Sequence, residues 1–167
     1  MSNDWLVVGL NHATASVEIR EAISPKPHEA GRINAIIKEA VGQEGVVVLS
    51  TCSRFEIYCQ PDKDGEQAVV EWLTRRAGRD LGASLYIRRG PEAVGHLFRV
   101  AAGLDSWIVG ETEILGQCKA AYQGACNEKT VNRYGHLAFQ RALMVGKKVR
   151  NETRIVGGIA SIGGAAA

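Results

Sequence analysis

The chain has 167 residues, of which 46% are hydrophobic and 23% are charged, and its formal net charge is +2. This composition is that of a soluble globular protein with one good core. No hydrophobic run is long enough to span a membrane, and residues 1–4 lack the cationic start of a secretory signal, so we expect a cytoplasmic protein. The net charge is too small to imply polyanion binding unless basic residues cluster locally.

About the first ninety residues alternate between short strands and helices. Apolar runs predict strands, a period-two alternation predicts a strand with one covered face, and apolar residues three and four apart predict helices. The expected elements are a strand over 5–10, helical stretches over 17–23 and 33–42, strands over 45–49 and 54–60 (the latter with one face covered), a helix from about 68 to 78 or 82, and a strand over 85–87. The β-α-β-β-α-β order predicts a ferredoxin-like α+β fold, an antiparallel sheet with two helices on one face.

After Pro91 the pattern is helical. Pro91 suits a first helical turn, and an apolar stripe follows it up to Gly103. An irregular link over 104–110 precedes a helix that begins near Glu111, and a last helix is expected from about Gly135 to the end of the chain. We therefore expect an N-terminal domain over 1–134, followed by the start of a long connecting helix over 135–167. Its apolar, uncapped end is typical of a truncated chain or of a helix whose packing partner lies in further sequence.

Cys52 stands where a buried apolar strand runs into a polar turn, with Arg54 two residues on. A rigid strand end and a nearby cation are how a reactive thiol is presented, because the cation raises the thiolate fraction. The alternative is a small core residue, since unpaired cysteines are among the most buried residue types. The cysteines are neither dense nor regularly spaced, which argues against a disulfide framework and a zinc site. Cys118 and Cys126 are expected to be structural.

The C-terminal stretch is locally basic. Its cations are opposed over the same stretch only by Glu152, so this end either docks a polyanion or forms a solvated helical face. No strand is followed by a G-x-G-x-x-G motif and a helix, so the chain contains no recognisable nucleotide site. The basic residues are Lys129, Arg133, Arg141, Lys147, Lys148, Arg150 and Arg154.

Four segments stand out along the chain: VGLNHATASVEIRE at 8–21, STCSRFEIY at 50–58, HLFRVAAGLDS at 96–106 and GETEILGQ at 110–117. In this order they resemble the signature blocks of glutamyl-tRNA reductase. The family continues into an NADPH-binding Rossmann domain and a helical dimerisation domain, neither of which is present in this sequence. The resemblance implies that residues 1–134 are the catalytic N-terminal domain and that the remainder begins the connecting, or spinal, helix.

The resemblance implies a reaction. A cysteine attacks the ester carbonyl of glutamate charged on its tRNA and forms a thioester, and hydride from NADPH then gives glutamate 1-semialdehyde, the entry to tetrapyrrole biosynthesis. Cys52 occupies the nucleophile's position, and a thioester keeps the acyl group activated after the tRNA leaves. His96 matches a histidine important for activity, which steers the thiol or handles a proton. Positions that match substrate-contacting residues are Thr51, Ser53, Arg54, Ser106, Glu111, Thr112, Glu113 and Gln117.

Several of these residues keep a second interpretation. Arg54 suits a bidentate pair with a glutamate carboxylate, or it is an exposed charge at a strand end. Glu111 recognises the substrate ammonium, or it caps a helix. A lone histidine on an apolar helix, such as His96, is often packed against a carbonyl. Asn11, His12 and Thr14 either line the same cleft or satisfy their own backbone.

The sequence departs from the family pattern near the expected pocket. Ser53 replaces a usual Asn, Phe55 replaces a usually polar residue, and Trp107 replaces a usual Met. Two other functions stay open: a stand-alone module that binds aminoacyl-tRNA or a partner protein without reduction, and a regulatory protein in which Cys52 senses oxidation. For the full-length family the resemblance implies a homodimer and, as a partner, glutamate-1-semialdehyde aminomutase.

Overall fold

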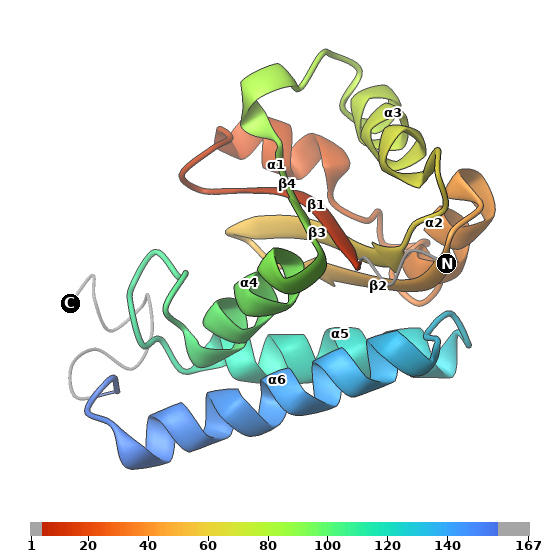
Figure 1. Cartoon of the computed structure of the whole chain (residues 1–167). Coiled ribbons are helices and arrows are strands. Elements are labelled where there is room, and N and C mark those ends of the chain that lie inside the picture. The colour runs from red at the N-terminus through yellow and green to blue at the C-terminus, as the bar shows by residue number, and fades with distance from the viewer. Residues whose placement is uncertain (1–4, 157–167) are drawn as a thin grey trace.

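A computed structural model describes residues 5–156 of the chain (Figure 1). Strands and helices alternate up to β4, and the elements after it are helical, as the sequence predicts. In chain order they are β1 (Leu6–Asn11), α1 (Val17–Ile23), α2 (Ile33–Val41), β2 (Glu44–Ser50), β3 (Arg54–Gln60), α3 (Gly65–Ala77), the short 3-10 helix η1 (Gly82–Ser84), β4 (Tyr86–Arg89), α4 (Gly90–Ala102), α5 (Glu113–Asn127) and α6 (Arg133–Glu152).

The strands form one antiparallel sheet in the order β2-β3-β1-β4. β1 lies inside the sheet, where Gly9 is opposite Glu56 of β3 on one side and Tyr86 of β4 on the other. A four-stranded antiparallel sheet combined with helices confirms the α+β class.

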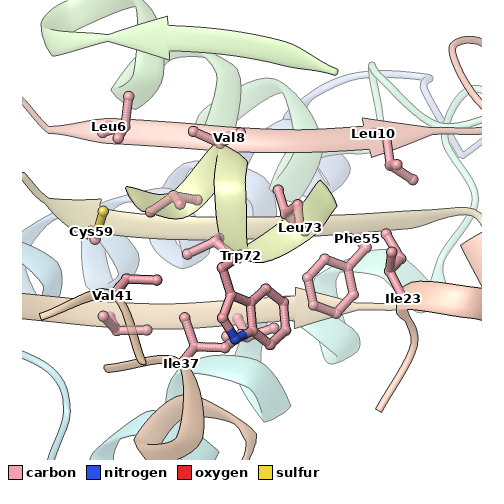
Figure 2. Close-up of a cluster of buried hydrophobic side chains, with 14 of the residues drawn as sticks. Leu6, Val8, Leu10, Ile23, Ile37, Val41, Phe55, Cys59, Trp72 and Leu73 are labelled. Carbon is pink, nitrogen blue, oxygen red and sulfur yellow. The ribbon is translucent and has the colours of Figure 1, made fainter. Parts of the chain in front are cut away.

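Helices α1, α2 and α3 cover one face of the sheet (Figure 1). Alternate strand residues point into this layer, including Val8 of β1 and Ile57 of β3, and both are fully buried. Figure 2 shows Phe55 lying beside Trp72 of α3, with the two rings 6.4 Å apart and nearly parallel. The strand side chains that point into this layer are apolar, and their burial stabilises the packing of the helices on the sheet.

The opposite face is also covered, by α4, α5 and α6. The prediction that only one face of strand 54–60 is covered is therefore wrong. The apolar stripes of the trailing helices pack on Val7, Val47 and Tyr58, because a free helix stripe needs a surface to bury it. Residues 54, 56 and 58 of β3 consequently lie in the interior.

The last helix is shorter than expected. α6 ends at Glu152, and Thr153 follows in an extended conformation, so the helix does not continue through residues 153–156. Residues 157–167, for which a helix was also predicted, lie outside the described residues. Within residues 5–156, no helix is both long enough and apolar enough to cross a membrane.

Candidate active site

Cys52 lies at the tip of the hairpin that joins β2 to β3 and is exposed. The backbone N–H of Thr51 donates to the carbonyl of Arg54 at 2.9 Å and closes the turn. The Thr51 hydroxyl oxygen then accepts from the backbone N–H groups of Ser53 and Arg54, each at 3.2 Å. Local hydrogen bonding by a threonine side chain holds the thiol at a fixed point beyond the sheet.

A cation that sequence reasoning did not single out contacts this turn. Arg20 of α1 donates from Nε to the Cys52 carbonyl at 3.2 Å and from a terminal nitrogen to the Ala15 carbonyl at 2.7 Å. Arg20 therefore ties α1 to the hairpin tip and places positive charge next to Cys52.

A cleft of about 580 Å³ opens beside the thiol, along the edge strand β2. Its walls come from the α1–α2 connection, from β2 and from α5. The predicted site residues Thr51, Cys52 and Gln117 all line it. This volume lies within the range of small-molecule sites.

One wall of the cleft is fixed by a polar chain. Asn34 of α2 accepts the backbone N–H of Val48 at 2.8 Å, which satisfies an edge donor of β2. Glu128, which follows α5, in turn accepts from the Asn34 amide at 2.7 Å and from the Ala35 backbone at 2.8 Å. The carboxylate thus caps α2 from a distant part of the chain and holds α2 and β2 together.

Behind the hairpin lies a second polar group, centred on the fully buried carboxylate of Glu56. One of its oxygens, Oε1, accepts from Arg54 at 3.0 Å and is 2.6 Å from Nε2 of His96. The same oxygen accepts the hydroxyl of Tyr86, while Oε2 accepts the Tyr58 hydroxyl at 2.7 Å. These residues come from β3, β4 and α4, so the network joins the sheet to the first trailing helix.

The charges of this network stabilise one another. Burial alone would raise the pKa of Glu56, but the Arg54 charge and the His96 hydrogen bond hold that pKa at about 2. Burial likewise opposes the charge of Arg54, and the Glu56 carboxylate outweighs it and raises the pKa of Arg54. Because an ionised carboxylate only accepts, Nε2 of His96 carries hydrogen and faces Glu56. Nδ1 of His96 is buried without a hydrogen-bond partner among the described residues.

Gly9 leaves the space that this network occupies. A Cβ atom at this position would lie 2.7 Å from Cγ of Glu56 and 2.7 Å from the Phe55 carbonyl oxygen. Glu56 and Tyr86 flank Gly9 in the sheet, so the absent side chain lets the Tyr86 hydroxyl reach across to the carboxylate. A glycine here is required by close approach.

Arg54 is 1% exposed, so its interpretation as an exposed strand-end charge is wrong. Its guanidinium donates to the Asp105 carboxylate at 3.2 Å and to the Asp105 backbone carbonyl, in addition to Glu56. The Asp105 side chain is 33% exposed, whereas that of Arg54 is fully buried. The Asp105 carboxylate therefore lies between the Arg54 guanidinium and solvent. His96, at 1% exposure, is bound to a carboxylate rather than packed against a backbone carbonyl.

Asp105 belongs to the link between α4 and α5, where the predicted site residues Ser106, Glu111 and Thr112 also lie, and Glu113 follows as the first residue of α5. The Glu111 carboxylate accepts the backbone N–H groups of Glu113 and Ile114, both at 3.0 Å, so it caps α5. The Ser106 hydroxyl lies 3.5 Å from the same carboxylate. Thr112 lines a different hollow, between α5 and α6, and the Glu113 side chain is exposed.

The predicted residues therefore fall into three groups. Thr51, Cys52 and Gln117 share the cleft, and Ser53 lies beside them in the hairpin turn, where its hydroxyl is 3.3 Å from that of Thr51. Arg54 and His96 belong to the buried network, and Ser106, Glu111, Thr112 and Glu113 surround the start of α5. Sequence reasoning missed Glu56, Tyr86 and Asp105. One signal in the sequence could have indicated the buried network. Gly9 interrupts the apolar strand 6–11, and a glycine inside a strand often marks the close approach of another group, here Glu56 of the neighbouring strand.

Fold and site together define an α+β domain that presents an exposed thiol beside a cleft. Residues 8–153 match the family model described as "Glutamyl-tRNAGlu reductase, N-terminal domain". The chain belongs to this family.

Curated relatives and a solved structure agree with the family match. Glutamyl-tRNA reductase of Desulfitobacterium hafniense is 43% identical over 155 residues, covering 90% of this chain and 35% of the relative. That of Akkermansia muciniphila is 41% identical, covering 95% and 48%. The structure of glutamyl-tRNA reductase from Methanopyrus kandleri has a TM-score of 0.79 and 40% identity, covering 97% of this chain and 38% of that one. The chain thus spans between about a third and a half of the length of these proteins.

Proposed function

We propose that this chain performs the acyl-transfer half of the glutamyl-tRNA reductase reaction. The Cys52 thiolate adds to the ester carbonyl carbon of the glutamyl group, and a tetrahedral species forms. When that species collapses, the bond to the ribose oxygen breaks, and the tRNA leaves with this oxygen, which takes up a proton. A glutamyl thioester remains on Cys52. The observation that carries this proposal is the exposed thiol on a fixed hairpin tip beside a cleft of about 580 Å³.

We propose roles for the residues around the thiol. Thr51 holds the turn, and Gln117 contacts the glutamyl group in the shared cleft. Arg54 pairs with the carboxylate of the substrate in place of the Asp105 carboxylate, because the two carboxylates offer the guanidinium the same acceptor oxygens. His96, whose Nδ1 has no hydrogen-bond partner within residues 5–156, handles a proton or steers the thiol. Ser53, Ser106, Glu111, Thr112 and Glu113 stay proposed substrate-contacting residues, although the carboxylate of Glu111 already caps α5.

The residues that the structure describes do not form an NADPH site. The described sheet is antiparallel, whereas a dinucleotide fold needs parallel strands and a glycine-rich turn before a helix. We propose that the complete protein reduces the thioester to glutamate 1-semialdehyde with NADPH bound outside this chain, and we derive no step through that cofactor. We also propose, from the resemblance to the family, that the complete protein is cytoplasmic, forms a homodimer and has glutamate-1-semialdehyde aminomutase as a partner.

We also propose that the first ninety residues or so are a ferredoxin-like core. Support comes from the β-α-β-β-α-β order and from the strand order β2-β3-β1-β4 with antiparallel neighbours. The division at residue 134 is kept as a proposal too, since α6 begins at Arg133.

The test is mass spectrometry of the folded chain after incubation with glutamyl-tRNA. A glutamyl adduct is expected on Cys52 and is expected to be absent from Cys52→Ala. Cys126→Ser is the matched control, because Cys126 is the other cysteine that is not fully buried, and it should keep the adduct. No adduct on the parent chain, or an unchanged yield in Cys52→Ala, would refute the proposal.

A further inference from the structure

Trp107 is an exposed aromatic residue on the link between α4 and α5. It is 67% exposed, whereas the other two tryptophans of the chain, Trp5 and Trp72, are 4% and 8% exposed. Leu104 and Val109 on the same link are also at least half exposed. A large indole on the surface loses the benefit of burial, so its position needs a reason.

The ring is held next to the hairpin that carries Cys52. It stacks on His12 with the planes 15° apart and the centroids 5.7 Å apart. The His12 backbone N–H donates to the Ser53 carbonyl at 2.8 Å, so one residue connects the indole to the neighbour of the thiol. Burial, and after it the Arg54 and Arg20 charges, lower the pKa of His12, which keeps its imidazole neutral and suited to stacking.

We propose that Trp107 is a stacking platform for the 3′-terminal adenine of the charged tRNA. This inference rests on the proposed function, because the ester that Cys52 attacks is on the terminal ribose and the base on that ribose must lie beside the hairpin. Unpaired bases stack on aromatic side chains, and His12 covers one face of the indole while the residue stays mostly exposed. Arg20, at the Cys52 carbonyl, forms no ion pair with a carboxylate within residues 5–156 and supplies a cation for the last phosphate.

The test compares two forms of one uncharged tRNA for glutamate, with and without the terminal adenosine. The chain is titrated with each, and tryptophan fluorescence is read, since Trp107 is the one tryptophan open to solvent. We expect quenching by the intact tRNA that the shortened tRNA does not produce. Trp107→Ala should bind the intact tRNA about five- to 150-fold more weakly and the shortened tRNA unchanged. Trp107→Phe keeps a stacking ring and most of the affinity, and Val109→Ala, on the same link, should behave as the parent.

A second readout covers the case of weak binding to uncharged tRNA. At subsaturating glutamyl-tRNA, the rate of adduct formation on Cys52 should fall by the same factor in Trp107→Ala and not in Val109→Ala. An adduct that forms at the parent rate in Trp107→Ala overturns the stacking platform and leaves the proposed function intact. Equal weakening of both tRNAs by Trp107→Ala also overturns it, because the loss would then be independent of the terminal base.

Discussion

The two faces of the sheet bury different side chains of the same strand. Under α1, α2 and α3, Phe55, Ile57 and Cys59 of β3 point into an apolar cluster, and we call this side the apolar face. Under α4, α5 and α6 the same strand contributes Arg54, Glu56 and Tyr58, which are just as buried. Both faces bury apolar surface, but the second, which we call the polar face, also encloses a carboxylate whose partners must all be in place. The predicted site residues Arg54 and His96 lie on the second face.

The largest expected effect is at the centre of the polar face. Glu56→Ala removes the carboxylate and leaves the Arg54 charge and the Tyr58 hydroxyl buried without it, so we expect a loss of about 3–5 kcal/mol in the free energy of unfolding. Denaturant unfolding measures this loss. Glu71→Ala is the control: Glu71 forms an exposed pair with Arg75 at 4.0 Å, and its removal should cost less than about 1 kcal/mol. Equal effects of the two substitutions would contradict the central role of Glu56.

The same carboxylate gives the polar face a pH dependence. The pKa of Glu56 is about 2 in the folded chain, below its ordinary value of 4.5. A lowered pKa contributes stability that is present above about pH 4.5 and is lost as the pH falls toward 2. Glu56→Gln cannot titrate at this position, so its unfolding free energy should fall less steeply between pH 4.5 and 2 than that of the parent. Parallel curves for the two proteins would show that Glu56 is not the titrating group.

The adjacent residue on β3 tests the apolar face. Ile57→Ala leaves a cavity in the apolar cluster beneath α1, α2 and α3 and removes apolar contacts, and we expect it to cost about 2–5 kcal/mol. Unlike the Glu56 effect, this loss should not depend on pH between 2 and 7. Unfolding measured at several pH values distinguishes the two neighbours, and a pH-dependent loss for Ile57→Ala would show that the faces are coupled.

The apolar face was accessible to prediction from sequence. Period-two alternation places the bounds of β3 at 54–60, and spacing of three and four residues places α2 within one residue. The turn that carries Cys52 was predicted as well, because an apolar strand followed by Ser, Thr and Ser has few other conformations. In each case the signal lies within a few residues of the element that it determines.

The polar face was not accessible in this way, for two reasons. Alternation records which residues are polar, and it does not record what covers them, so the face of β3 that carries Glu56 and Tyr58 was predicted to be uncovered. The partners are also distant in sequence: His96 is 40 positions from Glu56, and Asp105 is 51 positions from Arg54. Long-range polar pairs leave no local pattern, although three trailing helices with apolar stripes do require a second surface to pack on.

A smaller loss of stability is expected from a substitution at Gly9 of β1, which lies beside Glu56 in the sheet. Gly9→Ala puts a Cβ atom 2.7 Å from the Phe55 carbonyl oxygen and from Cγ of Glu56, and the resulting strain should cost about 1–3 kcal/mol. Gly116→Ala is the matched control, because Gly116 is at an exposed position of α5 and nothing lies within 4 Å of the place that its Cβ atom would take. That control should be neutral or should stabilise the chain by about 0.5–1 kcal/mol. A loss for Gly116→Ala as large as that for Gly9→Ala would argue against crowding at Gly9.

The smallest effect on stability is expected at the residue with the largest proposed role in chemistry. Cys52 is exposed at the hairpin tip, so Cys52→Ser should change the unfolding free energy by less than about 0.5 kcal/mol. Iodoacetamide, with peptide mapping, should label Cys52 in the folded chain and reach Cys59 only on unfolding. Burial, together with the Asp62 charge, raises the pKa of Cys59 to about 12, so this thiol is both covered and protonated. Cys118, whose pKa burial and the Glu56 charge also raise to about 12, should behave like Cys59 although it lies on the other face. Thiol reactivity therefore follows the exposure of the cysteine rather than the face of the sheet on which it lies, and labelling of Cys59 or Cys118 at the rate of Cys52 in the folded chain would contradict this.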